Sequence, residues 1–171
     1  MIIRKIMILS LVLLLLSCNS GFGLGETDVT IENLKRDISR PEQLAVWMRD
    51  NLMYRKFAND GDQGKLKCLR TRVADCDDYA EVAYEWLRAS SYYNPILVSI
   101  GTGSGGHVIV MFWESGWKFF SNDKIITVRN GTHYQDIANA VSRDWHSINI
   151  FEYGKLRKSI KNGDPLVKAG A

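Results

Sequence analysis

A helical run that opens on a cysteine constrains the fold of this chain more than any other stretch of its sequence. After Cys76, apolar residues recur every three or four positions, which predicts one buried helical face: Tyr79, Val82, Ala83, Trp86 and Leu87. Asp75 is the expected N-cap. Cys76 would then lie in the first turn, where unpaired backbone N–H groups and the helix dipole favour a thiolate. A small buried cysteine at a helix start explains the same residues without chemistry.

Helical patterns precede this run, and strand patterns follow it. Helices are expected over residues 31–38, from Pro41 to near Tyr54, and over 134–141; strands are expected over 96–100, 107–113, 117–121, 124–128 and 145–153. Residues 107–113 are apolar at both odd and even positions, which is typical of a central strand. The order predicts an α+β fold, with the N-terminal helices and the cysteine-bearing helix packed on an antiparallel sheet.

The first 17 residues have the layout of a signal peptide. Arg4 and Lys5 precede an apolar run that is short for a transmembrane helix, and Ser17-Cys18 follows it. A cysteine after a small residue at this point resembles the bacterial lipoprotein signal, in which Cys18 is acylated. Plain secretion with cleavage near Ser20 and a retained anchor are the alternatives. We therefore expect a lipoprotein of the bacterial cell envelope, anchored on the periplasmic side or at the cell surface.

The remainder of the chain is expected to form one domain. Residues 18–30 read as a flexible tether, residues 31–154 as the folded domain, and residues 155–171 as a polar basic tail. Loss of Arg4 and Lys5 with the signal lowers the formal charge from +3 to +1. A nearly neutral protein has no electrostatic reason to bind nucleic acid, so no nucleic-acid partner is expected. We expect a monomer that meets the membrane through its lipid anchor.

Cys68 and Cys76 are the two cysteines that remain beyond the signal. The bacterial envelope can be oxidising, and a disulfide between them would close a short loop. Such a bond would remove the nucleophile and would indicate a structural envelope protein.

A thiolate nucleophile needs a base, and the base needs a group that orients it. His107 opens the predicted central strand, directly after Gly103-Ser104-Gly105-Gly106. A hairpin centred on Ser115-Gly116 would return Asp123 to the level of His107, on the same face of the sheet. This register predicts a His107 ring nitrogen within about 4 Å of the Cys76 sulfur, with the Asp123 carboxylate on the other ring nitrogen. A turn role is the alternative for Asp123.

These motifs resemble the transglutaminase-like superfamily, and more narrowly its small bacterial cysteine peptidases. The resemblance rests on Asp75-Cys76-Asp77-Asp78-Tyr79-Ala80, on Gly106-His107-Val108-Ile109-Val110 and on Asn122-Asp123, and it covers about residues 40–128. It implies a papain-like fold, in which a helix carries the cysteine and an antiparallel sheet carries the histidine and the aspartate. It also implies that Cys76 is the nucleophile, His107 the general base and acid, and Asp123 the orienting residue.

The resemblance bears on cofactors as well. No cofactor is required by the implied chemistry, but some periplasmic relatives bind calcium through acids that flank the cysteine. Asp75 and Asp77 match those acids in type and position, and carboxylate oxygens suit calcium. A helix cap and an exposed helix acid are the simpler explanation of the two residues.

The implied reaction is acyl transfer through a thioester on Cys76, with a peptide or protein as substrate. Water as acceptor would give a peptidase or amidase, and an amine would give a transglutaminase-type cross-linker; the small size and the signal favour hydrolysis. The Cys76 backbone N–H is one expected oxyanion donor, and Asn59 and Gln63 are candidates for another. The alternatives are a catalytically silent binding lipoprotein of the same fold, or the structural protein with a Cys68–Cys76 disulfide.

Overall fold

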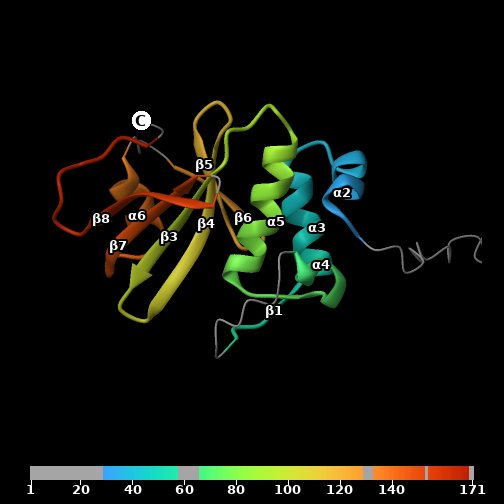
Figure 1. Ribbon diagram of the computed structural model, residues 1–171, viewed down its shortest axis with the longest axis horizontal. Coiled ribbons are helices and arrows are strands. Elements are labelled where there is room, and N and C mark those ends of the chain that lie inside the picture. The colour runs from blue at the N-terminus through green and yellow to red at the C-terminus, as the bar shows by residue number, and fades with distance from the viewer. Residues whose placement is uncertain (1–28, 58–65, 129–132, 153, 170–171) are drawn as a thin grey trace, which may run out of the picture.

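The computed structural model describes residues 29–57, 66–128, 133–152 and 154–169, and they form an α+β fold, as the sequence predicts (Figure 1). One antiparallel sheet has the strand order β6-β5-β4-β3-β7-β8. Its strands are β3 (Ile96–Thr102), β4 (Gly105–Trp113), β5 (Trp117–Ser121), β6 (Lys124–Thr127), β7 (Trp145–Glu152) and β8 (Lys155–Lys161). The helices are α2 (Ile31–Asp37), α3 (Pro41–Asn51), α4 (Lys67–Thr71), α5 (Cys76–Ala89) and α6 (Tyr134–Val141). A separate parallel pair joins β1 (Met53–Tyr54) to β2 (Val73–Ala74).

The sheet separates two apolar clusters, and β4 contributes to both. Val110 and Phe112 lie in the cluster that holds the buried residues of α2 to α5, here called the α5 cluster. Ile109 and Met111 lie in the cluster that holds α6, here called the α6 cluster. All four side chains are completely buried, as alternation in a strand covered on both faces requires. β4 is therefore the central strand that the sequence predicts.

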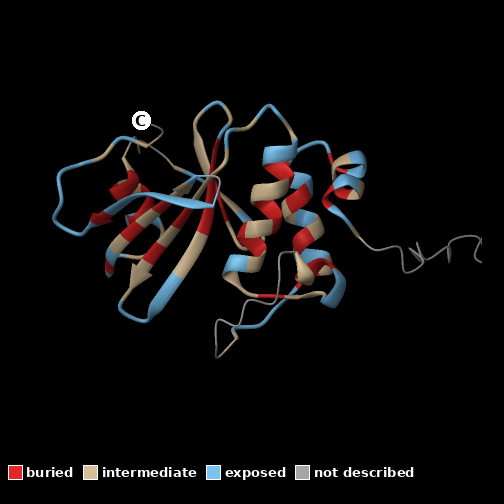
Figure 2. Cartoon of the chain, viewed as in Figure 1, coloured by how far each residue is buried: buried red, intermediate tan, exposed pale blue. Residues whose placement is uncertain are grey.

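Helix α5 packs its apolar stripe against the sheet and against α2 and α3. The stripe consists of Tyr79, Ala80, Val82, Ala83, Trp86 and Leu87. Figure 2 shows buried positions along α5 and α3, with exposed positions on their outer sides. Burial of a large apolar side chain such as Trp86 stabilises the fold by about 1.5–3 kcal/mol. This packing fixes the helix and so fixes the position of Cys76 at its first turn.

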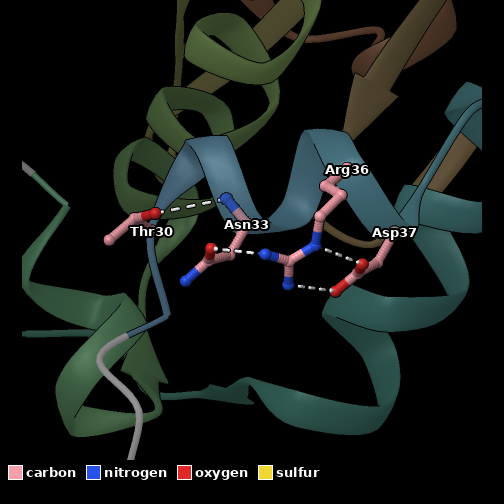
Figure 3. A network of polar contacts seen from close by, with 4 residues as sticks. All are labelled: Thr30, Asn33, Arg36 and Asp37. Atoms are coloured by element: carbon pink, nitrogen blue, oxygen red, sulfur yellow. Dashed lines mark hydrogen bonds and ion pairs between the residues drawn. The ribbon is translucent and has the colours of Figure 1, made fainter.

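Helix α2 covers α5 from the outside, and polar contacts at its surface define its ends (Figure 3). The Thr30 hydroxyl accepts a hydrogen bond from the Asn33 N–H at 3.2 Å and caps the N-terminus. Near the C-terminus, the Arg36 guanidinium donates to the Asp37 carboxylate and to the Asn33 side-chain oxygen. These contacts are exposed and contribute little to stability, so the buried Ile31 and Leu34 hold the helix in place.

The C-terminal boundary of the domain differs from the prediction. Residues 155–161 are not part of a tail: they form β8, the edge strand paired with β7. The sequence pattern hides this strand because Ile160 is its one buried residue, while its lysines and Arg157 are exposed. Lysines on an edge strand also prevent pairing with another chain.

The predicted signal peptide, Cys18 and nearly all of the tether lie outside the described residues. Within the part of the chain that the structure describes, no helix is long and apolar enough to cross a membrane.

Candidate active site

Cys76 is the first residue of α5, and a reciprocal pair of hydrogen bonds fixes the helix start there. The Asp75 carboxylate accepts from the Asp78 N–H at 3.4 Å, and the Asp78 carboxylate accepts from the Asp75 N–H at 3.2 Å. This capping box pairs N–H groups that have no partner inside the helix. The Cys76 thiol is free and half-buried at the position that the sequence predicts.

The Cys76 sulfur lies beside the backbone N–H of Val108 in β4. Burial raises the pKa of the Cys76 thiol, and the negative charges of Asp77 and Asp75 add to the rise, while the Val108 N–H acts against it. The thiol is therefore the main form at neutral pH. The helix start alone does not produce the thiolate, so the site needs a base.

The β1–β2 pair leads the chain into Cys76 and brings Tyr54 to the site. The Met53 N–H donates to the Arg72 carbonyl at 2.8 Å, and the Arg55 N–H donates to the Ala74 carbonyl at 2.9 Å. These bonds hold Met53 and Tyr54 in an extended strand, where the sequence predicts the end of a helix. The Tyr54 ring stacks on Tyr79 with centroids 6.5 Å apart, and its exposed fraction is 51%.

Tyr54 is a site residue that sequence reasoning missed. Burial raises the pKa of its hydroxyl, and the charges of Cys76, Asp75 and Asp77 raise it further, so the hydroxyl lies close to all three. The contact depends on a parallel pairing between β1 and β2, and no local sequence pattern signals a two-residue strand.

His107 lies near the start of β4, and its ring contacts Ser121 at the end of β5. Its Nε2 lies 2.8 Å from the Ser121 hydroxyl oxygen. Burial lowers the pKa of His107, because a charged imidazolium is poorly solvated in this half-buried position. The ring is therefore neutral at neutral pH.

His107 and Val108 are neighbours in β4 with different surroundings. The β3–β4 register pairs His107 with Ile100, which lies in the α6 cluster, whereas Val108 packs against the α5 cluster. The Cys76 sulfur thus lies beside the peptide bond that joins these two residues, but the hydrogen bonds of the described residues include none from Cys76 to the ring. The predicted approach of the Cys76 sulfur to a His107 ring nitrogen stays a prediction.

Asp123 is not the partner of the His107 ring. The hairpin is centred as the sequence predicts, because Trp113 pairs with Trp117 and Val110 with Phe120. The β4–β5 ladder stops at that second pair, and Ser121 instead pairs with Lys124 across the turn between β5 and β6.

Asn122 and Asp123 are the two residues of that turn, and Asn122 has the left-handed φ of 52° that such turns use. The carboxylate of Asp123 lies close enough to Tyr79 to raise the pKa of its hydroxyl. The turn role weighed for Asp123 is thus the one that the structure shows, and Ser121 occupies the place at the ring expected for the acid.

Cys68 lies in α4 and is buried, with 2% of its surface exposed. Both Cys68 and Cys76 are free thiols, so the disulfide considered as an alternative is not formed in this structure. Burial raises the pKa of Cys68 to about 12, which makes it unreactive at neutral pH. Cys76 is therefore the better placed nucleophile of the two.

Asp75 and Asp77 form a close acidic pair beside Cys76. Burial and the neighbouring Asp75 raise the pKa of Asp77 to about 6. Two carboxylates held together favour a bound cation or a shared proton. The pair fits part of a calcium site, which takes six to eight oxygen ligands; among the described residues, no three acidic, histidine or cysteine side chains are grouped to hold a metal.

The fold is similar to that of known structures. Calcium-bound LapG of Legionella pneumophila aligns with a TM-score of 0.52 and 15% identity over 74% of each chain. A second structure of that protein aligns with a TM-score of 0.53 and 15% identity, again over 74% of each chain. The chain has a transglutaminase-like fold. No family model matches the sequence, and no curated protein does. At this identity the likeness shows the fold alone.

Proposed function

We propose that this chain is a cysteine peptidase-like enzyme that transfers an acyl group through a thioester on Cys76. One observation carries the proposal: the sulfur at the start of α5 lies beside the peptide bond between His107 and Val108. The transglutaminase-like fold supports it, because that fold places a cysteine helix against a histidine strand. A peptide or protein is the substrate, and hydrolysis is the favoured outcome.

The reaction begins when the Cys76 thiol gives its proton to the His107 ring and the sulfur attacks a substrate carbonyl carbon. The Cys76 backbone N–H at the open helix end is placed to stabilise the resulting oxyanion. Collapse of this intermediate breaks the amide bond and forms the thioester, and the leaving amine takes the proton from His107. The same ring then deprotonates a water molecule, which attacks the thioester carbonyl. The carbon–sulfur bond breaks, the acid leaves, and the ring returns its proton to the Cys76 sulfur.

Proton transfer requires the ring to reach the sulfur, and among the described residues the recorded hydrogen bond of the ring goes to Ser121. Catalytic contacts are often long in free enzymes and tighten with substrate. The second candidate function is a silent binding lipoprotein of the same fold, and the raised pKa of the half-buried Cys76 thiol favours it. The two functions differ in whether His107 activates the thiol.

Labelling of Cys76 with a thiol-reactive acyl-like probe separates them. Cys76→Ala should abolish labelling at that site, and His107→Ala should slow it near pH 7 by ~10²–10⁴-fold, the usual contribution of a base. An equal labelling rate in the wild type and in His107→Ala would select the silent protein. Peptide hydrolysis by the wild type alone would then establish the reaction.

We propose, in addition, that Asp75 and Asp77 hold a calcium ion. The close pair of carboxylates and the calcium-bound form of LapG support this. A cation there would offset the negative charges that raise the pKa of Cys76, and so favour the thiolate. Backbone carbonyls and waters would complete the coordination.

We also propose that acylated Cys18 anchors the protein in the bacterial envelope. The proposal rests on the sequence of residues 1–18. An anchor at one end of a tether would leave the domain free to meet protein substrates near the membrane.

A further inference from the structure

We propose that Ser121, and not Asp123, is the positioning residue of His107, and that it holds the ring with the proton on Nε2 so that Nδ1 is the basic nitrogen. This inference rests on the proposed function, because it identifies which ring atom takes the thiol proton. It starts from the 2.8 Å separation of Nε2 and the Ser121 hydroxyl oxygen.

The Ser121 hydroxyl has a fixed position because the backbone on both sides is held in strands. Ser121 ends β5 and pairs with Lys124 in β6, while Phe120 before it pairs with Val110 in β4. The β4–β5 ladder ends at the pair just before Ser121, and the His107 ring reaches the hydroxyl at that point. Two neighbouring strands therefore bring the ring and the hydroxyl together without a flexible loop.

The tautomer follows from the base role assigned to the ring, because the Ser121 hydroxyl can either donate to Nε2 or accept from Nε2–H. A neutral imidazole has one N–H donor and one basic nitrogen, and burial keeps this ring neutral. Nε2 is engaged by Ser121, so the base function falls to Nδ1. Nδ1 can accept a proton only when Nε2 carries the other, and Nε2–H must then donate to the Ser121 hydroxyl oxygen.

Ser121 also differs in kind from the aspartate that the sequence suggests. A carboxylate orients the ring and stabilises the imidazolium by its charge, whereas a hydroxyl only orients it. The acidic residue nearest to Ser121 in sequence is Asp123, and its charge adds to the rise in the pKa of Tyr79 that burial causes. A positive charge near the start of β4 is Lys56, whose Nζ lies 3.8 Å from the point where a Cβ added to Gly105 would stand. Neither contributes to the pKa of His107, whose shift comes from burial.

The test is nitrogen NMR of the full chain with ¹⁵N-labelled histidine, with the His107 signals assigned by their loss in His107→Gln. In the wild type we expect a protonated Nε2 and an unprotonated Nδ1. Ser121→Ala should give a mixture of tautomers, and Ser121→Thr should restore the wild-type spectrum because it keeps the hydroxyl. Asp123→Asn is the matched control and should leave the spectrum unchanged.

The same variants have a kinetic readout. Ser121→Ala should slow Cys76 labelling by roughly tenfold, less than loss of the base itself, and Ser121→Thr should recover most of the rate. A proton on Nδ1 in the wild type would overturn the proposal without any variant. So would a tautomer that responds to Asp123→Asn but not to Ser121→Ala. Failure of the proposed function would look different, because Cys76 would label equally fast in the wild type and in His107→Ala while the tautomer still depended on Ser121.

Discussion

The sulfur of Cys76 lies beside the backbone N–H of Val108, the amide between His107 and Val108 in the central strand. This relationship links the start of α5 to the start of β4, two elements that are 31 positions apart in sequence when counted from Cys76 to His107. It exists because the α5 cluster packs the helix against the sheet, with Val110 and Phe112 beneath it. The position of the nucleophile is thus a result of core packing.

The first prediction concerns the pH dependence of Cys76 alkylation. Because burial and nearby acids raise its pKa, the rate should still be rising at pH 9, where an ordinary cysteine has begun to level off. Iodoacetamide labelling followed by mass spectrometry measures this rate at each residue. Cys68 is the internal control: with a pKa near 12 it should label far more slowly throughout. A Cys76 profile that is flat above pH 7 would contradict the raised pKa.

The second prediction concerns a gain of charge at the ring. Ser121→Asp would place a carboxylate against Nε2, and an opposite charge at that distance typically raises a histidine pKa by about one to three units. The pKa of His107 should therefore move from below its ordinary value to above it, as measured by NMR titration. Asp123→Glu, which lengthens the acid in the turn, should leave the pKa unchanged. A larger effect from the turn variant would return the orienting role to Asp123.

The sequence predicts most of the fold because its signals there are local. Helix α6 and strand β5 have the predicted bounds, and the hairpin turns at Ser115-Gly116. The α4 helix was not predicted, since it is five residues long and both flanking residues, Leu66 and Arg72, have left-handed φ values that no capping pattern announces.

The candidate site was predicted less completely, because it depends on where strands stop. Alternation gives the register that aligns residue 123 with His107, but the ladder ends at the pairing of Val110 with Phe120. Residues 122–123 then form a turn, so Ser121 and not Asp123 hydrogen-bonds to the His107 ring. Side-chain periodicity carries no information on the last hydrogen bond of a ladder. The catalytic roles of Cys76, His107 and Asp123 stay predictions.

The third prediction concerns membrane attachment. If Cys18 is acylated, Cys18→Ala should either leave residues 1–17 uncleaved or release the protein from the membrane fraction. Intact mass and fractionation of cells that express each form measure this. Cys68→Ala is the matched control, because it removes a buried thiol far from the signal and should keep the lipid. An unchanged mass and membrane fraction in the Cys18 variant would rule out the lipid anchor.

The fourth prediction concerns stability and pH. The pKa of Asp77 is raised from 3.8 to about 6, so the folded state binds its proton more tightly than the unfolded state. The stability that this provides is present below pH 4 and is lost as the pH rises through 6. Asp77→Asn removes the charge, and in the presence of a chelator it should be more stable than the wild type at pH 8.

Asp77 is only partly buried and stays accessible to solvent, so solvent screening reduces the effect to roughly 1 kcal/mol, or about 3 °C in the melting temperature. The advantage of Asp77→Asn should shrink between pH 6 and pH 4. Asp164→Asn, on an exposed carboxylate outside the site, is the comparison variant. A constant difference between Asp77→Asn and the wild type across this range would show that Asp77 titrates normally.

The fifth prediction is the response of the same pair to calcium. An ion that binds only the folded protein raises the melting temperature, by about 2.7 kcal/mol of stability at 100 times its Kd. Calcium should therefore stabilise the wild type and EGTA should reverse the effect, while Asp77→Asn should lose the response and keep its own higher starting stability. Magnesium at the same concentration should act more weakly, because it demands a stricter octahedral geometry. Equal melting temperatures of the wild type in calcium and in EGTA would show that Asp75 and Asp77 are only a helix cap and its neighbour. His107 would then have to deprotonate the Cys76 thiol without help from a cation.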